Sequence, residues 1–471
     1  MSIKDIHTVY FLGIGGIGMS ALARWFKHNA FQVEGYDRTS TPLTDELENE
    51  GIRIHFNDEV SAISQEVLKN KAGTLVVYTP AIPKEHKIYN YLKSGEYTLM
   101  KRSQLLGLVT DEMFTVAVAG THGKTTTSSM IAHILKASSL NCTAFLGGIA
   151  TNYNSNLILN EEGGTNLVAV VEADEFDRSF LTLHPNIAVV TSADADHLDI
   201  YSDESDLQNS FRDFISQVRK SGHLFIEDAV ANTLFKETIF FDSLKDVSVS
   251  RYSLEKGDFV AKNLRVEEGS FVFDFQGPQN YIEALKLFVP GFHNVENAIA
   301  AIAVALQLGI KEQKIKEAIA SFRGVKRRFE YVLRSPQLVY IDDYAHHPTE
   351  IDAFLRSVKA LYPGKKVTVI FQPHLYSRTR DFVEGFAKSL NLADEVWLLD
   401  IYPAREKPIE GVSSQLIFDK LHSVEKRMCK FEDFHQLLKK GHTEVLVTIG
   451  AGDIGQMVEP IKNMLLNSDN K

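Results

Sequence analysis

The sequence of 471 residues is poor in cysteine, in basic charge and in long apolar runs. Its two cysteines, Cys142 and Cys429, can build neither a disulfide framework nor a cysteine-rich zinc site. Lysine and arginine number 50 against 61 aspartates and glutamates, and the resulting net charge of −11 argues against a general nucleic-acid binder. No stretch supplies the ~18 to 20 apolar residues of a membrane span, and the first residues do not resemble a secretion signal. We therefore expect a cytoplasmic protein that acts on small molecules, without nucleic-acid binding or membrane insertion.

The length and the alternation of apolar runs with helical patterns predict an α/β protein. At about 150 residues per domain, the chain corresponds to roughly three domains. Strand-like runs alternate with helical patterns, which is typical of parallel sheets with crossover helices. These runs are VYFL, VEGYD and TLVVYTPAI, then FTVAVAG, and later LVYIDD, KVTVIF, EVWLLD and EVLVTIG. The segment NAIAAIAVALQLGI predicts a buried core helix. We predict a Rossmann-like domain at 1–110, a central P-loop ATPase-type domain at 111–323 and a second Rossmann-like domain at 324–471. Short alternating runs between about 223 and 289 predict that the mostly parallel central sheet carries an added antiparallel sheet.

The first candidate site is a glycine-rich turn directly after VYFL. Gly13, Gly15 and Gly18 form the pattern G-x-G-x-x-G, and Asp37 follows at the end of the next strand-like run. Such glycines bring backbone N–H groups close to a diphosphate, and the acidic residue can hold a ribose hydroxyl. The pattern alone does not say which nucleotide binds. A nicotinamide-dependent oxidoreductase fits it, and so does a turn that only packs a strand against a helix.

The second candidate site, GTHGKTT, has the context of a phosphate-binding loop. It follows the strand-like FTVAVAG and precedes the helical SSMIAHILKAS. In such loops backbone amides surround the phosphates, a lysine reaches the β- and γ-phosphates, and a Ser or Thr hydroxyl ligates Mg²⁺. The spacing is shorter than usual, because the usual spacing would place a glycine at Val118. We predict that ATP is bound by Gly120, Thr121, His122, Gly123, Lys124, Thr125 and Thr126.

Acidic and histidine side chains follow two further strand-like runs. Glu172 comes at the end of LVAVVE, and His197 follows NIAVVTSADAD. Because ligands of open parallel sheets lie at the carboxyl ends of the strands, we expect Glu172 and His197 to hold Mg²⁺ together with Thr125 beside the γ-phosphate. A capping histidine and a solvated acidic loop are the alternative interpretation.

The last predicted domain carries two polar clusters, DDYAHHPTE and FQPHLYSRTRDF, each after a strand-like run. Guanidinium groups bind carboxylates and phosphates bidentately, so arginines beside a histidine suit an anionic substrate. Solvated charge on an exposed loop is the alternative. The basic pair Arg327 and Arg328 fits either a phosphate contact or a solvated linker. The candidate residues of the two clusters are Asp342, Asp343, Tyr344, His346 and His347 in the first, and His374, Arg378 and Arg380 in the second.

Together these motifs resemble the Mur ligase family, ATP-dependent amide-forming enzymes that add amino acids to the peptidoglycan precursor. The resemblance covers essentially the whole chain, through GIGGIGMSALA, GTHGKTTT, EADE, DADHLD, GFHNVENAIAA, RRFE, DDYAHHPTEI, FQPHLYSRTRDF and GAGDIG. The phosphate loop alone would also fit folylpolyglutamate synthases. The glycine-rich opening, DDYAHHPTE and FQPHLYSRTR are similar to the alanine-adding branch of the family.

The resemblance implies a function for each domain. The first would hold the UDP of UDP-N-acetylmuramate on its glycine turn, the second would bind ATP and Mg²⁺, and the third would bind L-alanine and close over the site. The implied catalytic residues are Lys124, Glu172, His197, His346 and Arg378. The other implied contacts are Asn294, Asn297, Arg328 and Asp343 for ATP; Gly15, Gly16, Gly18, Met19, Asp37 and Tyr344 for the UDP substrate; and His346, His374, Arg378 and Arg380 for the amino acid.

The implied reaction is ligation through an acyl phosphate by a monomer or weak homodimer. A recycling ligase that attaches an intact murein tripeptide to UDP-N-acetylmuramate has the same fold and is the nearest alternative. Two positions depart from the family. Several relatives have a carbamylated lysine that bridges metals, but no lysine occurs between His197 and Lys220; and Arg405 stands where a small residue is usual.

Overall fold

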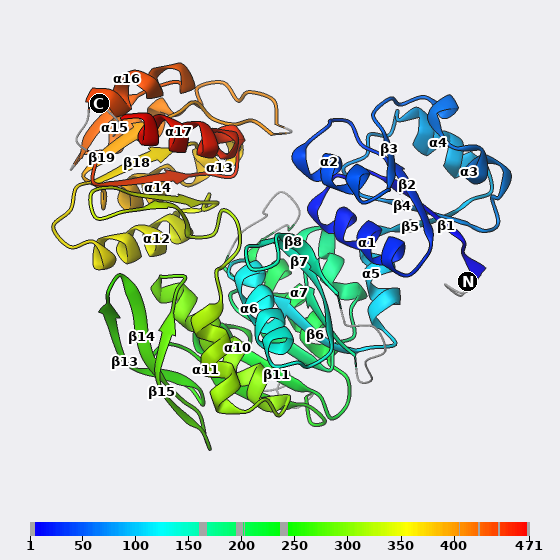
Figure 1. Cartoon of the computed structure of the whole chain (residues 1–471), viewed down its shortest axis with the longest axis horizontal. Helices are drawn as coiled ribbons and strands as arrows, with labels where there is room; N and C mark the ends of the chain where they lie inside the picture. Colours follow the sequence, from blue (N-terminus) through cyan, green and yellow to red (C-terminus); the bar gives the residue numbers. More distant parts are fainter. Residues whose placement is uncertain are drawn as a thin grey trace. The chain divides into compact units, whose positions relative to one another are not determined.

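The computed structural model describes residues 5–159, 167–194, 201, 203–235, 244–404, 406–422, 424–440 and 443–468. These residues fall into two compact units. Figure 1 labels their helices and strands. The first contains Met1–Val260 and Ile299–Ala318, and the second contains Ala261–Ala298 and Ile319–Lys471. No described helix is both long and apolar enough to cross a membrane. The boundaries predicted at 110 and 323 stay a prediction.

The first unit begins with a five-stranded parallel sheet in the order β3-β2-β1-β4-β5. The predicted strands VYFL, VEGYD and TLVVYTPAI are confirmed as β1, β2 and β4. The sheet is typical of a Rossmann-like domain, because every strand is parallel and a helix follows most of them. The elements are β1 (Thr8–Leu12), α1 (Ile17–His28), β2 (Gln32–Tyr36), α2 (Pro42–Asn49), β3 (Arg53–His55), α3 (Gln65–Lys69), β4 (Thr74–Tyr78), α4 (Lys87–Ser94), β5 (Thr98–Lys101) and α5 (Arg102–Thr110).

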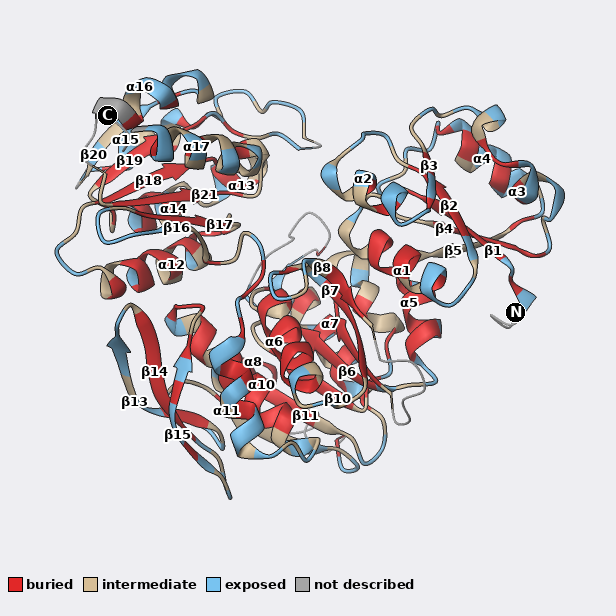
Figure 2. Cartoon of the chain, in the orientation of Figure 1, coloured by how far each residue is buried: buried red, intermediate tan, exposed pale blue. Residues whose placement is uncertain are grey.

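The first unit continues with a seven-stranded sheet in the order β12-β11-β10-β6-β9-β7-β8, in which β8 is antiparallel to β7 and the other pairs are parallel. Its core runs along β6, β9 and β10, in which residues 115–119, 168–171 and 187–190 are buried. Figure 2 shows β6 and β10 as largely buried. The elements are β6 (Phe114–Ala119), α6 (Lys124–Ala137), β7 (Cys142–Ala150), β8 (Ser155–Ile158), β9 (Val168–Glu172), the 3₁₀ turn η3 (Phe176–Thr182), β10 (Ile187–Val190), α7 (Glu204–Ser216), β11 (His223–Glu227), α8 (Asp228–Leu234) and β12 (Ser248–Tyr252).

The two sheets of this unit are joined through Asn156 of β8. Its side chain is fully buried and donates hydrogen bonds to the Ile17 carbonyl (2.5 Å) and the Ser20 hydroxyl (2.8 Å) of α1. It also accepts a hydrogen bond from the Arg24 guanidinium at 2.6 Å. Helix α1 is therefore fixed to the edge of the seven-stranded sheet as well as to its own.

The antiparallel region is shorter than the sequence predicted, because β11 and β12, which fall within its expected range, are parallel strands. Strand β11 is parallel to β10, and β12 is parallel to β11. The polar residues of β11 and β12 are explained by their place near the edge of the sheet, where β12 is the last strand. His223 of β11 contacts the Ser250 hydroxyl of β12 at 2.9 Å. An edge strand exposes part of its surface, so its sequence alternates without antiparallel pairing.

A separate three-stranded sheet, in the order β13-β14-β15, belongs to the second unit. Here β14 and β15 are antiparallel, as the alternating runs predicted for this part of the chain. Helix α10 follows it, as the run NAIAAIAVALQLGI predicted, and α11 comes next. More than half of each of these two helices, within Ile299–Ala318, belongs to the first unit. The elements are β13 (Val260–Glu267), β14 (Ser270–Gln276), β15 (Tyr281–Leu287), α10 (Phe292–Gln307) and α11 (Glu312–Ser321).

The second unit also holds a six-stranded sheet in the order β16-β17-β21-β18-β19-β20. Strand β16 is antiparallel to β17 and the other pairs are parallel, so the predicted α/β class is confirmed here as well. The elements are β16 (Glu330–Arg334), β17 (Val339–Asp343), α12 (Pro348–Leu361), β18 (Val367–Phe371), α13 (Tyr376–Asp381), α14 (Val383–Leu390), β19 (Glu395–Leu398), α15 (Gln415–Lys420), β20 (Glu425–Met428), α16 (Phe434–Lys440), β21 (Val445–Ile449) and α17 (Val458–Ser468).

Candidate functional site

The phosphate loop connects the end of β6 at Ala119 to the start of α6 at Lys124. Gly120 has φ 139° and Gly123 has φ 81°, a region of backbone conformation that favours glycine. A Cβ added to Gly120 would lie 2.2 Å from the Thr191 hydroxyl oxygen. Both glycines are therefore required by the backbone itself, as expected of a loop that brings N–H groups to a phosphate.

Two hydroxyl groups that follow β10 hold the loop in place. The His122 amide donates to Ser192 Oγ at 2.6 Å, and that oxygen lies 3.0 Å from Thr121 Oγ1. The Thr191 hydroxyl donates to the His122 carbonyl. The His122 ring lies 3.5 Å from the Asp194 carboxylate. The loop is thus preorganised by bonds to the neighbouring strand, which lowers the cost of ordering it around a ligand.

Lys124 points back into the loop and forms an ion pair with Glu175. Its Nζ donates to the Gly120 carbonyl at 2.5 Å and lies 2.8 Å from Glu175 Oε2. Burial alone would lower the pKa of Lys124, but the carboxylates of Glu175, Asp174 and Glu172 outweigh it and raise the pKa. The lysine is therefore positively charged, and three acidic side chains after β9 act on it.

Glu172, predicted as a metal ligand, is the last residue of β9, and its side chain contacts the backbone of β7. Its Oε2 accepts a hydrogen bond from the Gly147 amide at 2.9 Å, and a Cβ on Gly147 would lie 2.3 Å from either carboxylate oxygen. Thr125 and Thr126 are buried in the first turn of α6. His197, the other predicted ligand, lies outside the described residues. Within the described ranges, no three His, Cys, Asp or Glu side chains gather as a ready metal site.

The glycine turn after β1 leads into α1, whose cap residue, Gly16, has no side chain that could cap the helix. Asp37, predicted to hold a ribose hydroxyl, accepts a hydrogen bond from the Gly15 amide on its Oδ2 at 2.8 Å, so in the structure this carboxylate supports the turn. Gly18 lies in the first helical turn, and Met19 is buried behind it. The amide groups that begin a helix lack partners within it, which makes this end suited to an anion.

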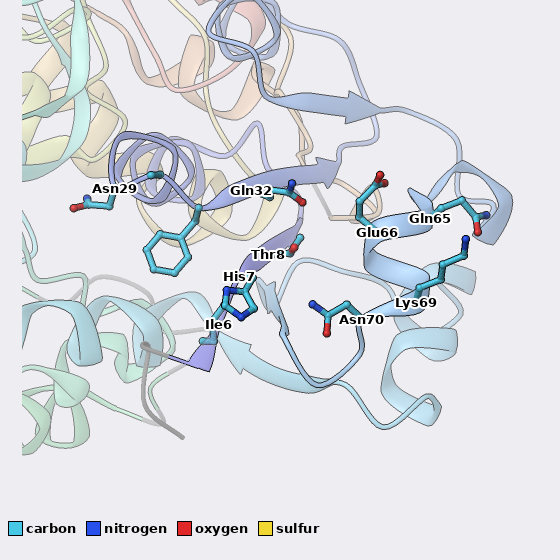
Figure 3. A pocket seen from close by; sticks show the side chains of 11 residues that line it. Ile6, His7, Thr8, Asn29, Gln32, Gln65, Glu66, Lys69 and Asn70 are labelled. Carbon is cyan, nitrogen blue, oxygen red and sulfur yellow. The ribbon is translucent and has the colours of Figure 1, made fainter.

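A pocket of about 660 Å³ lies at the opposite edge of the same sheet. Figure 3 shows its lining, which includes His7, Gln32, Glu66 and Lys69. These residues lie at or before the amino ends of β1 and β2 or on α3. The pocket contains none of the predicted site residues, and ligands of open α/β sheets bind at the carboxyl ends of the strands.

In the second unit, Asp343 ends β17 and is held by two backbone amides. Its Oδ2 accepts from the Phe329 amide and its Oδ1 from the Ala345 amide, each at 2.7 Å. Burial raises the pKa of Asp343 to about 7, against the opposing charge of Arg328. Asn294 and Asn297 lie buried in the first turns of α10, where the Asn297 amide donates to Asn294 Oδ1 at 3.2 Å.

The basic pair Arg327 and Arg328 lies beside the Tyr344 ring, but its two members have different acidic partners. Arg327 lies 3.0 Å from the fully buried Asp342 and donates to the Gly450 carbonyl at 2.6 Å. It is therefore bonded within the fold and is not a residue of a solvated linker. Arg328 lies 5.0 Å from the centre of the Tyr344 ring and 3.9 Å from Glu350. Arg327 lies 5.1 Å from the centre of the same ring, and both guanidinium groups remain partly exposed, so Arg327 is distinguished by its ion pair with Asp342.

The two predicted amino-acid clusters meet at a pair of histidines. The rings of His346 and His374 lie 5.9 Å apart, and His374 also stacks on Tyr402. His346 Nδ1 lies 3.3 Å from the Glu350 carboxylate. Arg378 and Arg380 are both on α13, but they face different surroundings. Arg378 is 8% exposed, whereas Arg380 is exposed and bound to Asp381 at 2.7 Å.

Several residues at these sites were not found from the sequence. Glu175 belongs to the motif EADE, yet only its pairing with Lys124 distinguishes it from the acidic residues around it. Gly147 contributes through the close approach of its backbone to Glu172, and Thr191 and Ser192 contribute through hydroxyl contacts with the loop. Neither kind of contact leaves a signature in the sequence. Arg405 lies outside the described residues.

A phosphate loop between β6 and α6, with a glycine turn on a separate parallel sheet, defines a multidomain α/β enzyme that uses nucleotides. Family models match most of the chain: "Mur ligase family, catalytic domain" at residues 8–112, "Mur ligase middle domain" at 118–305 and "Mur ligase, glutamate ligase domain" at 327–452. The chain belongs to the Mur ligase family.

Individual relatives cover the chain from end to end. The UDP-N-acetylmuramate–L-alanine ligase of Christiangramia forsetii is 49% identical over 469 residues, which are 99% of this chain and 100% of the relative. The ligase of the same name from Flavobacterium psychrophilum is 50% identical over 465 residues, 99% of each chain. Among solved structures, the UDP-N-acetylmuramate-alanine ligase of Thermotoga maritima has a TM-score of 0.80 at 28% identity and covers 98% of this chain and 99% of its own.

Proposed function

We propose that this chain is an ATP-dependent ligase that joins L-alanine to the lactyl carboxylate of UDP-N-acetylmuramate. The observation that carries the proposal is the identity of about half the residues, over 99% of the chain, to enzymes named for this reaction. The predicted site residues of the phosphate loop, the glycine turn and the C-terminal domain supply the groups that the reaction needs. The protein acts in the cytoplasm, as a monomer or weak homodimer.

The carboxylate must first be activated, because it is a poor acyl donor. A lactyl carboxylate oxygen attacks the γ-phosphorus of ATP, the bond to the β-phosphate oxygen breaks, and ADP leaves. The loop amides and Lys124 hold the β- and γ-phosphates in line for this transfer. Lys124 is suited to the role because its charge is held within the loop, 2.5 Å from the Gly120 carbonyl.

The amine of L-alanine then attacks the acyl carbon, and phosphate leaves with the former carboxylate oxygen. His346, His374, Arg378 and Arg380 serve the amino acid and the anionic acyl phosphate. Arg378 is the stronger candidate of the two arginines for a buried anion, because it is nearly buried while Arg380 is bound to Asp381. Positioning and charge stabilisation account for the catalysis, without a covalent enzyme intermediate.

The nucleotides are held by separate parts of the chain. Gly15, Gly16, Gly18 and Met19, with Asp37 behind the turn, receive the UDP portion of the substrate, together with Tyr344. Asn294, Asn297, Arg328 and Asp343 contribute to the ATP site. Asn294 and Asn297 suit an adenine because amide groups both donate and accept hydrogen bonds.

The residues around the phosphate loop also fit Mg²⁺. Oxygen ligands suit this ion. Glu172 ends β9, and the Thr125 hydroxyl lies in the first turn of α6, directly after the loop. His197 completes the predicted set. When bound, Mg²⁺ neutralises the charge that builds up on the transferred phosphoryl group. The Gly147 amide keeps the Glu172 carboxylate in place for it.

Phosphate release tests this function. The wild-type protein is incubated with UDP-N-acetylmuramate, ATP and Mg²⁺, with L-alanine, L-serine, glycine or the murein tripeptide as acceptor. We expect the fastest release with L-alanine. Release with the tripeptide but not with L-alanine would indicate the recycling reaction instead, and no release with any acceptor would refute the ligase function. Reduction of a nicotinamide without added ATP would point to an oxidoreductase.

A further inference from the structure

Arg102 is the first residue of α5, and its side chain lies against the glycine turn of the neighbouring helix α1. A Cβ added to Gly18 would be 2.9 Å from an Nη atom of Arg102 and 3.4 Å from its Cζ. The guanidinium therefore packs against the backbone of the first turn of α1. Any larger residue than glycine at position 18 would push it away.

The other side of the same guanidinium faces the acidic residues beside the phosphate loop. An Nη atom lies 3.5 Å from Asp174 Oδ2. Asp174 is one of the carboxylates whose charge acts on Lys124. Arg102 thus lies between the start of α1 and Asp174, and all these residues belong to the first unit.

The ion pair with Asp174 is loose enough to share Arg102 with a ligand. Tight charge-assisted bonds are about 2.7 to 2.9 Å long, shorter than this 3.5 Å contact. Both side chains remain partly exposed, at 22% for Arg102 and 40% for Asp174. A guanidinium has several N–H donors in a planar fork, so one carboxylate at this distance leaves donors for an anion.

We propose that Arg102 binds the diphosphate of the UDP-sugar substrate, together with the amide groups at the start of α1. This inference rests on the proposed function, because it assumes that the glycine turn receives UDP. The position of the guanidinium over Gly18 brings a full positive charge to a helix end that already favours anions. In the free enzyme Asp174 holds the side chain in this orientation. Because the net charge of −11 gives no general attraction for an anionic substrate, a local cation at the site would strengthen its binding.

Calorimetric binding of three ligands to the full-length protein tests the proposal. The ligands are UDP, UDP-N-acetylglucosamine and UDP-N-acetylmuramate, which share the diphosphate, whereas only the last carries a lactyl carboxylate. We expect Arg102→Ala to weaken all three by similar factors, about tenfold to a hundredfold, as loss of a charge-assisted contact implies. Arg102→Lys should recover part of this loss, because it restores the charge without the fork.

The matched control is Lys101→Ala, which removes the neighbouring cation. Lys101 pairs with Asp177 at 3.2 Å rather than with the glycine turn, so its loss should leave the binding of all three ligands unchanged. ATP affinity and the unfolding temperature without ligand should match the wild type in Arg102→Lys. These two measurements separate a contact with the diphosphate from a general loosening of the unit.

Three results would overturn the proposal. They are unchanged binding of UDP to Arg102→Ala, a loss restricted to UDP-N-acetylmuramate, and an equal loss in Lys101→Ala. The second result would place the guanidinium on the lactyl carboxylate. The proposed function fails separately, when the wild type binds UDP compounds but releases no phosphate with any acceptor.

Discussion

Lys124 of the phosphate loop and Glu175 after β9 form an ion pair in which Nζ lies 2.8 Å from a carboxylate that is fully buried. The Tyr201 hydroxyl donates to the Glu175 carbonyl at 2.6 Å and helps to fix this segment. In the proposed function, a bound γ-phosphate takes the same ammonium group. We therefore expect ATP to compete with Glu175 for Lys124, so that the pair couples the proposed nucleotide site to the segment between β9 and η3.

Replacing Lys124 by alanine should remove most of the ligase activity. We expect phosphate release to fall at least about a hundredfold, the usual effect of losing one charge that stabilises the transition state. Steady-state phosphate release at saturating substrates measures it. Lys220→Ala is the control, since this lysine is exposed and pairs only loosely with Asp246 at 3.3 Å, and it should keep wild-type activity. Full activity in Lys124→Ala would refute the assignment of the loop.

Glu175→Gln should strengthen ATP binding and make folding more dependent on it. The substitution removes the carboxylate that competes with the phosphates but leaves Lys124 buried without its main partner, a costly arrangement. We expect a lower unfolding temperature without nucleotide and a larger increase on adding ATP than in the wild type. Differential scanning calorimetry with and without ATP measures both. An ATP-induced increase equal to or below that of the wild type would contradict competition by Glu175.

Gly147→Ala should weaken the binding of Mg²⁺, because it displaces the carboxylate of Glu172, a proposed metal ligand. The new methyl group would lie 2.3 Å from the Glu172 carboxylate oxygens and must displace them. We expect the Mg²⁺ concentration for half-maximal activity to rise about tenfold, since loss of a supporting contact typically costs 10- to 100-fold in metal affinity.

Gly364→Ala is the control for this substitution. Gly364 has φ 78° and no atom within 4 Å of an added Cβ, so alanine there strains the backbone without touching the site. Its stability should fall, while its Mg²⁺ requirement stays that of the wild type. An unchanged requirement in Gly147→Ala as well would show that the position of Glu172 does not matter to the metal.

The stability of the protein should carry a pH dependence from Asp343. Its pKa rises from 3.8 to about 7 on folding, so the folded state holds the proton more tightly than the unfolded state. The contribution of Asp343 to stability is therefore greatest below about pH 4 and decreases between pH 4 and 7, by up to about 1.4 kcal/mol per pH unit.

Comparison with Asp343→Asn isolates this contribution, because asparagine does not titrate. Denaturation of both proteins between pH 4 and 8 should show the wild type losing its advantage over the variant as the pH rises. An advantage that instead grows with pH would mean that Arg328 and the two amide bonds of Asp343 lower its pKa in the folded protein.

The sequence was sufficient to predict elements with strong local signals. The phosphate loop was predictable because a strand, two glycines, Lys124 and a helix follow in fixed order, and the structure has them as β6 and α6. In the first sheet β1, β2 and β4 were predictable from their buried apolar runs, and so were β17, β18, β19 and β21 in the last sheet. Strands β3, β5 and β20 were not predicted, because they are short and partly exposed. By contrast, the polar residues of β11 and β12 imitated an antiparallel sheet, because they lie near an edge.

The contacts between distant segments could not be predicted. Glu175 and Lys124 are 51 positions apart, and nothing in the spacing indicates that this acidic residue rather than Asp174 pairs with the lysine. Arg378 and Arg380 looked equivalent in the sequence. A separation of two residues on a helix turns their side chains to different sides, so one is buried and the other exposed.

The most direct test of the account follows an oxygen atom from the substrate to the released phosphate. UDP-N-acetylmuramate labelled with ¹⁸O in both lactyl carboxylate oxygens is incubated with ATP, Mg²⁺, L-alanine and the wild-type protein, and the products are analysed by mass spectrometry. Ligation through an acyl phosphate predicts that each phosphate released carries one ¹⁸O and that the amide product keeps the other. Unlabelled phosphate, or phosphate release without an alanyl amide, would contradict it.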